Sequence, residues 1–166
     1  TYMNRSAGPV LGTLSGSLTI GATTAFFDLT YGPAIGTVAF DNDTNNNGVP
    51  DTLAMLDSFW HYDPDTAVAP GKNDFYSVAL HEMIHALGLG TSETWSSLAS
   101  GTTWLGTNAQ ALNGGSGANL VDSGGGHVRN GLISTNVYTG SAQEAAMDPS
   151  LTTGTRKELT AMDVAF

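Results

Sequence analysis

Two histidines and a glutamate, His81, Glu82 and His85, stand together in the run HEMIH. Side chains four residues apart on a helix project from the same face, so both imidazoles can reach one metal ion. Glu82 lies at the flank of that face, where its carboxylate can accept a proton from a metal-bound water without being a ligand. The residue types and their spacing are those of a metal-dependent peptidase.

The element that must position these side chains is a helix over residues 73–88. Asn73 or Asp74 can cap its start, the interior contains no proline or glycine, and Gly88 suits the position after its end. Apolar residues fall on nearly every side of this segment, which predicts a helix buried in the middle of the domain. Buried histidine and glutamate side chains need partners, because an unpaired buried polar group is costly.

A catalytic zinc ion has three protein ligands and one open position, so a third ligand must lie elsewhere in the chain. His127 follows three glycines, which would let the backbone bend and bring its imidazole to the metal. His61, in the run FWHY, is more typical of a partly exposed strand residue. Acidic third ligands remain open alternatives at Glu93, Asp122 and Glu144, and Asp122 could instead hold the tautomer of a histidine ligand.

Four stretches of the sequence resemble the metzincin clan of zinc endopeptidases, near its bacterial matrixin-like and leishmanolysin-like members. They are HEMIHALGLG, a later single histidine, the run MDPSL at Met147 and the final LTAMDVAF, and they cover roughly residue 74 to the C-terminus. The resemblance implies that Gly88 turns the chain after the active-site helix. It also implies that Met147 forms a tight turn beneath the metal.

The third ligand departs from the commonest metzincin pattern, in which it lies six residues after the second histidine. That position is Thr91 here, and its neutral hydroxyl is a poor zinc ligand. In the leishmanolysin-like arrangement an insertion separates the two ligands. His127, well downstream of His85, fits that variant, so its assignment follows from the resemblance and from elimination.

The activity that the resemblance implies is that of a secreted bacterial zinc endopeptidase acting on proteins or peptides. Glu82 would be the general base, and zinc would be held by His81, His85 and His127. Such enzymes often have a second donor to the oxyanion, frequently a tyrosine, and Tyr138 lies in the expected stretch before Met147.

An oxygen-rich segment, DNDTNNNGVPD, precedes the helix. Counting from Asp43, the residues Asn45, Asn47 and Asp51 occupy positions three, five and nine of an EF-hand-like loop, which predicts Ca²⁺ as a second metal. The twelfth position is Ala54 and lacks the usual bidentate acid. An Asn/Gly-rich turn without metal explains the segment equally well. A calcium-stabilised binding or adhesion module on a protease-like fold is the rival interpretation, but it gives no reason for HEMIH.

Composition bounds the remaining function classes. The 166 residues suit one catalytic domain, divided into subdomains of about 1–90 and 91–166, and we expect a monomer. The net charge of −10 argues against nucleic acid and anionic membranes as partners. Without cysteine there is no disulfide framework and no thiolate metal site. No stretch of about 20 apolar residues is present.

The coarse pattern predicts an α+β fold. Strands are expected at residues 13–20, 24–30, 35–40 and 58–62, a turn or short helix at 53–56, and short helices at 94–100 and 108–112 within a long loop. Trp95 and Trp104 are expected to anchor that loop by packing. The capping-box pattern at residues 155–158 predicts a final amphipathic helix. Together these elements predict a metzincin-like domain, with an N-terminal twisted sheet packed on the buried active-site helix and a loop-rich C-terminal subdomain ending in a helix.

Overall fold

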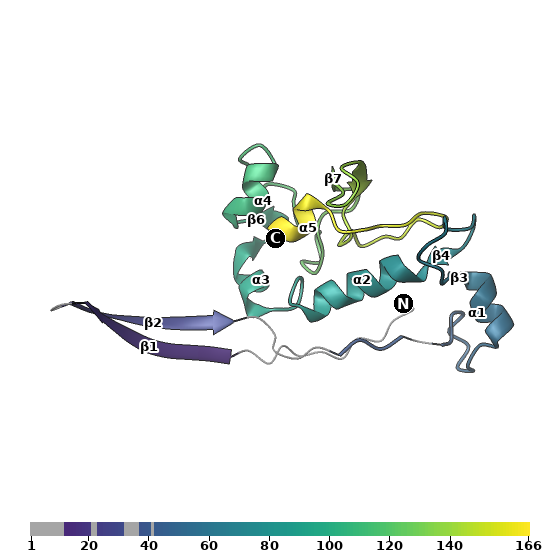
Figure 1. Ribbon diagram of the computed structural model, residues 1–166, viewed down its shortest axis with the longest axis horizontal. Helices are drawn as coiled ribbons and strands as arrows, with labels where there is room; N and C mark the ends of the chain where they lie inside the picture. The colour runs from purple at the N-terminus through teal and green to yellow at the C-terminus, as the bar shows by residue number, and fades with distance from the viewer. Residues whose placement is uncertain (1–11, 21–22, 32–36, 41) are drawn as a thin grey trace.

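The computed structural model describes residues 12–20, 23–31, 37–40 and 42–166 (Figure 1). Its elements in chain order are β1 (Gly12–Ile20), β2 (Thr23–Tyr31), α1 (Leu53–Phe59), β3 (Trp60–His61), β4 (Asn73–Asp74), α2 (Phe75–Ala86), α3 (Glu93–Leu98), β5 (Ala99–Ser100), β6 (Thr103–Trp104), α4 (Thr107–Leu112), β7 (Ile133–Thr135), β8 (Ala142–Glu144) and α5 (Ala161–Ala165). The strands pair as four small two-stranded sheets. This mixture of helices and small sheets is consistent with the predicted α+β class. None of the described helices is both long and apolar enough to cross a membrane.

The first two predicted strands are present and form an antiparallel hairpin, β1–β2, in which Gly12 pairs with Tyr31. The hairpin extends away from the helices, so among the described residues it does not form the sheet expected over α2 (Figure 1). The strand expected at residues 35–40 is wrong for residues 37–40, and residues 35–36 lie outside the described part. Phe40 instead packs its ring against Phe75, with centroids 4.8 Å apart.

The helix α2 forms where the sequence predicts it. Asp74 is its N-cap, and its side chain accepts a hydrogen bond from the backbone N–H of Ser77. The expectation of burial on all sides is wrong, because Met83 is 50% exposed and Leu87, just beyond the helix, is 74% exposed. These side chains border an apolar groove between α2, α3 and α5.

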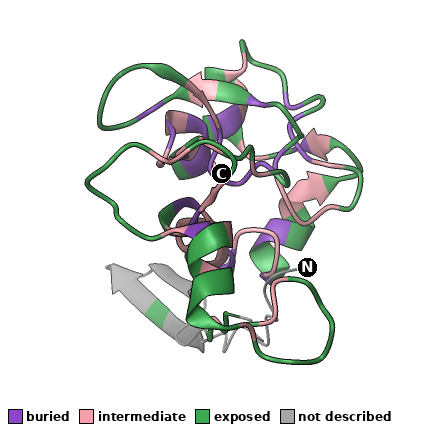
Figure 2. Ribbon diagram, turned by 90° about the vertical axis from the view of Figure 1, so that its right-hand side faces the viewer, coloured by how far each residue is buried: buried purple, intermediate pink, exposed green. Residues whose placement is uncertain are grey.

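The short helices α3 and α4 lie within two residues of their predicted bounds. Trp95 and Trp104 are buried and pack against each other with tilted rings whose centroids are 4.6 Å apart, and both contact the ring of Phe166. The expectation that the tryptophans anchor the long loop by packing is therefore confirmed. Buried residues concentrate in this C-terminal half, while α1 is largely exposed (Figure 2).

The C-terminal helix begins later than predicted. The capping box is formed by Thr160 and Asp163 and not by residues 155–158, and α5 spans only Ala161–Ala165. The earlier segment is held extended by ion pairs with distant residues. Arg156 contacts the buried carboxylate of Asp74 at 2.9 Å, and Lys157 contacts Glu144 at 2.9 Å.

The ion pair between Arg156 and Asp74 fixes the C-terminal segment to the start of α2. Burial of Asp74 acts to raise the pKa of its carboxyl, but hydrogen bonds from Arg156 and Ser77 and the charge of Arg156 outweigh it. The pKa of Asp74 therefore lies below its ordinary value, and the carboxylate stays ionised at the helix N-terminus. A negative charge there is also favoured by the helix dipole.

Candidate metal centre

Three histidine side chains converge at the C-terminal half of α2. His81 and His85 lie one turn apart on that helix, and His127 comes from the loop before Val128. Ligand atoms of all three rings lie within 4.8 Å of one another. The Nε2 atoms of His85 and His127 are 3.1 Å apart, although the residues are 42 positions apart in the chain. Among the described residues, the side chains that could hold a metal ion together are these three histidines.

The two helix histidines are oriented by backbone carbonyls. Nδ1 of His81 lies 2.8 Å from the carbonyl oxygen of Ala146, and Nδ1 of His85 lies 2.7 Å from that of Leu89. A carbonyl only accepts hydrogen bonds, so each ring donates through Nδ1–H and, when neutral, carries its lone pair on Nε2. Such hydrogen bonds on the far nitrogen fix ring orientation in metal sites.

The loop of His127 is closed by Asp122. The backbone N–H of His127 donates to Oδ1 of Asp122 at 3.0 Å, and the backbone N–H of Asp122 donates back to the carbonyl of His127 at 3.1 Å. Oδ2 of Asp122 lies 3.8 Å from Nδ1 of His127, whereas the contact with His85 is made by Nε2. Asp122 therefore stands beside the third histidine as a supporting carboxylate and is not one of the converging side chains.

The other candidate third ligands lie outside the histidine cluster. The Thr91 hydroxyl donates to the carbonyl of His85 at 2.6 Å and so stabilises the end of α2. Glu93 is exposed at the first position of α3, and Glu144 pairs with Lys157. His61 lies in β3, half-exposed, with Nε2 3.3 Å from the Thr66 hydroxyl, as expected for a strand residue outside the site.

Gly88 and Met147 both lie where the backbone turns. Gly88 ends the α2 segment with a φ of 117°, a left-handed conformation that favours glycine. Met147 is fully buried in a tight turn that is closed by the Asp148 N–H donating to the Ala145 carbonyl at 3.1 Å. The carbonyl of Met147 also accepts from the Val128 N–H at 3.2 Å, so this turn is joined to the residue after His127.

Asp163 in α5 holds the same turn from the other side. Its carboxylate accepts hydrogen bonds from the backbone N–H groups of Ala146 at 2.9 Å and Met147 at 3.0 Å. It also caps its own helix through Thr160. A chain of contacts thus runs from α5 through the turn to the Ala146 carbonyl and on to His81.

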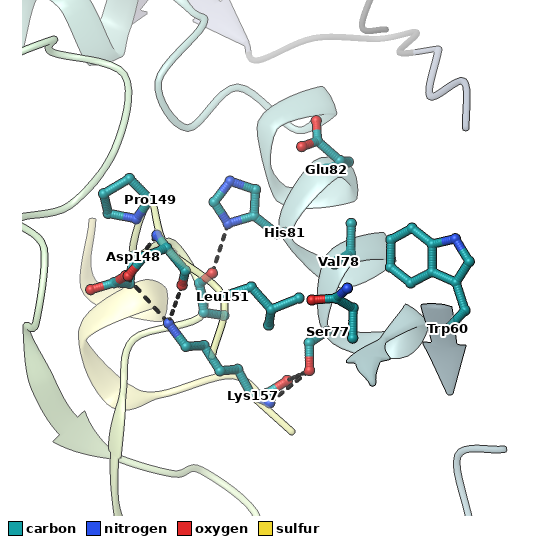
Figure 3. Close-up of a pocket in the computed structure, with 12 residues that line it drawn as sticks. Trp60, Ser77, Val78, His81, Glu82, Asp148, Pro149, Leu151 and Lys157 are labelled. Atoms are coloured by element: carbon teal, nitrogen blue, oxygen red, sulfur yellow. Dashed lines mark hydrogen bonds and ion pairs between the residues drawn. The ribbon is translucent and has the colours of Figure 1, made fainter. Parts of the chain in front are cut away.

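A cavity of about 330 Å³ opens beside His81, between α2 and the segment after Met147 (Figure 3). Glu82 lines this cavity together with His81, and Trp60, Val78 and Leu151 supply apolar walls. Glu82 and His81 therefore border one space large enough for part of a substrate.

Tyr138 does not line this cavity. It is 68% exposed, and its backbone N–H donates to the Asn136 side chain. The structure therefore does not bring the expected oxyanion donor to the histidines.

Two of the three rings have the spacing that a transition metal such as zinc requires. Two nitrogens that are each about 2.0 Å from one tetrahedral ion lie about 3.3 Å apart, close to the 3.1 Å between His85 and His127. The ligand atoms of all three rings lie within a wider limit of 4.8 Å. Neutral imidazoles whose far nitrogens donate to carbonyls are suitable ligands for it. Imidazole also suits copper, iron and nickel, so the donor set alone does not select one metal.

The segment predicted to bind calcium forms a self-contained turn. Asp43 accepts hydrogen bonds from the backbone N–H groups of Asn47 and Gly48, and Asn45 and Thr44 donate to Asp51. The Asn47 side chain accepts from the Val49 N–H at 2.8 Å. These bonds account for the geometry of the loop, and binding of calcium by it stays a prediction.

Several groups at the site were not identified from the sequence. The carbonyls of Ala146 and Leu89 leave no side-chain signature. Asp163 was part of a recognised motif but had no assigned role. A single acid in the largely apolar run LTAMDVAF is a usable signal, because a buried carboxylate must find donors.

Comparison with protein-family models, curated proteins and solved structures gave no significant match.

Proposed function

We propose that this protein is a zinc-dependent endopeptidase of metzincin type. The observation that carries the proposal is the convergence of His81, His85 and His127, with Glu82 lining the cavity beside them. Two helix ligands, a third ligand from a loop and an adjacent carboxylate are the parts that hydrolysis of an amide by activated water requires. The resemblance of the HEMIH region and of the C-terminal motifs supports the same assignment.

In the proposed reaction the three imidazoles would hold zinc, which supplies a Lewis acid that makes water more acidic and polarises the scissile carbonyl. Glu82 would accept the proton of the attacking water and pass it to the leaving amine. The carbonyls of Ala146 and Leu89 keep His81 and His85 in the tautomer that presents Nε2. The substrate chain would lie along the cavity that His81 and Glu82 line.

The test compares three purified proteins on fluorescently labelled casein: wild type, Glu82→Gln and Glu93→Gln. Glu93 is exposed on α3 and serves as a matched acid outside the site. We expect the wild type to bind one zinc ion and cleave casein. Glu82→Gln should keep the zinc and lose activity by about 10²–10⁴-fold, because proton transfer by a positioned base contributes that much. Glu93→Gln should match the wild type.

Two outcomes would contradict the proposal. If Glu82→Gln cleaves casein as fast as the wild type, Glu82 is not the base. If the wild type binds zinc but cleaves no protein substrate, the site serves another hydrolytic reaction or a binding role. A chelator control is needed as well, since activity that survives removal of the metal would come from a contaminant or from different chemistry.

A further inference from the structure

The loop that carries His127 has almost no side chains with which to hold its own position. Residues 123–126 are one serine followed by three glycines, and Gly125 has a φ of 74°. Glycine loses more conformational freedom on folding than any other residue, so such a loop needs external contacts to adopt one conformation. Asp122 closes the loop upon itself but does not fix it relative to α2.

One buried side chain from another element contacts this loop directly. The indole Nε1–H of Trp95, in α3, donates to the carbonyl of Gly125 at 2.6 Å. The ring of Trp95 is itself held firmly, because it is 4% exposed and packs in a tilted arrangement against both Trp104 and Phe166. Its backbone N–H donates to the Ser92 hydroxyl at the N-cap of α3. The indole is therefore a fixed point from which the loop position can be set.

The segment between α2 and Trp95 also places the second helix histidine. The Leu89 carbonyl accepts from His85, and the Gly90 backbone approaches the loop so closely that an added Cβ would lie 1.9 Å from the Gly126 carbonyl oxygen. Residues 89–95 thus contact both the ring of His85 and the loop of His127. This one segment therefore contributes to the relative position of these two rings.

We propose that Trp95 is a positioning residue for the third metal ligand. By donating its indole N–H to Gly125, it holds the glycine loop where Nε2 of His127 meets that of His85, and it thereby raises the affinity for metal. This inference rests on the proposed metal centre and assigns Trp95 no contact with substrate or metal. Outer contacts that orient ligands typically change metal affinity by about 10–100-fold.

A matched control exists in the same aromatic cluster. Trp104 is as deeply buried as Trp95 and packs against it, but its Nε1 has no hydrogen-bond partner among the described residues. Trp95→Phe removes a donated hydrogen bond and keeps an aromatic ring. Trp104→Phe reduces the size of the ring by the same amount but removes no hydrogen bond. The pair of variants separates the hydrogen bond from the packing.

The experiment measures the dissociation constant for Zn²⁺ by competition with a chromophoric chelator, in wild type and both variants. The visible spectrum of the Co²⁺-substituted proteins reports ligand geometry. Amide hydrogen exchange of residues 122–127 is measured without metal. We expect Trp95→Phe to bind Zn²⁺ about tenfold or more weakly, to alter the Co²⁺ spectrum and to exchange faster in the loop. Trp104→Phe should stay within about twofold of the wild type.

Equal weakening in both variants would assign the effect to packing and overturn the proposal, as would wild-type affinity in Trp95→Phe. A wild type that binds no metal would overturn this inference together with the proposed function. A wild type that binds zinc without cleaving casein would leave this inference standing. If Trp95→Phe does not fold, the test uses the wild type alone. When Zn²⁺ binds, the indole ¹⁵N–H resonance of Trp95 must shift more than the corresponding resonance of Trp104.

Discussion

Replacing Asp163 by asparagine tests whether the C-terminal helix positions the first histidine of the site. The carboxylate is buried and accepts four hydrogen bonds, three of them from the backbone N–H groups of Ala146, Met147 and Thr160 and one from the Thr160 hydroxyl. Three of these bonds go to Oδ2 and one, from Met147, goes to Oδ1. An asparagine that keeps its oxygen at Oδ2 turns its NH₂ group toward the Met147 N–H.

The expected cost follows from that one mismatch. A buried donor left without an acceptor costs about 1–3 kcal/mol. In a domain of this size, each kcal/mol lowers Tm by about 2–4 °C, so the variant should melt roughly 2–12 °C below the wild type. The turn also carries the carbonyl of Ala146, which orients His81. We therefore expect zinc to bind about tenfold more weakly, at the low end of the effect of outer contacts.

The assay is thermal unfolding of the metal-free proteins by circular dichroism, followed by chelator competition for Zn²⁺. Asp57→Asn is the matched control, because Asp57 is exposed on α1, far along the chain from the turn. The control should change neither Tm nor affinity. A lower Tm for Asp163→Asn with an unchanged zinc affinity would refute the link from α5 to His81. An unchanged Tm would refute the assigned hydrogen bonds themselves.

Two further changes probe the neighbouring parts of the site. Thr91→Val should lower Tm by a few degrees but leave the zinc affinity within about threefold of the wild type, because the hydroxyl caps the His85 carbonyl and is not a ligand. Zinc affinity is measured by chelator competition. A loss of affinity as large as that of His127→Ala would show that Thr91 is a ligand. Asp74→Asn should change the pH dependence of Tm. The pKa of Asp74 is lowered in the folded protein, so its stabilising effect is present above the unfolded value of about 3.8 and is lost as pH falls through the folded value. The Tm difference between variant and wild type should be full at pH 7 and shrink below pH 4, and a constant difference would argue against the ion pair as its cause.

Local features of the sequence were enough to predict the helix that carries His81 and His85. The cap at Asp74, the absence of interior proline or glycine and the glycine at 88 are all short-range signals, and α2 begins and ends within two residues of the prediction. What surrounds α2 is set by contacts between distant segments. An apolar composition showed that its faces could be buried, but not which element would bury them, and Met83 and Leu87 remain exposed.

The C-terminal helix illustrates a competition between local and distant interactions. The sequence offers two capping patterns in succession, one at residues 155–158 and one at Thr160 with Asp163. Local chemistry alone favoured the earlier one. In the folded chain Arg156 bonds to Asp74, 82 residues away, and Lys157 bonds to carboxylates on both sides of the turn at Met147. These partners keep the first segment extended, so the helix starts at the second pattern.

The three histidines differ in how far the local sequence determines their placement. His81 and His85 share a face because they belong to one helix, so their approach follows from the spacing alone. His127 reaches the same point through a turn closed by Asp122 and a loop contacted by residues 89–95, and no regular period connects 85 with 127. If the helix pair is held without metal while the loop depends on a few backbone contacts, changes in that loop should alter metal affinity without unfolding α2. The selectivity and strength of the centre would then be set by the third ligand, which is the part of the site that spacing could not predict.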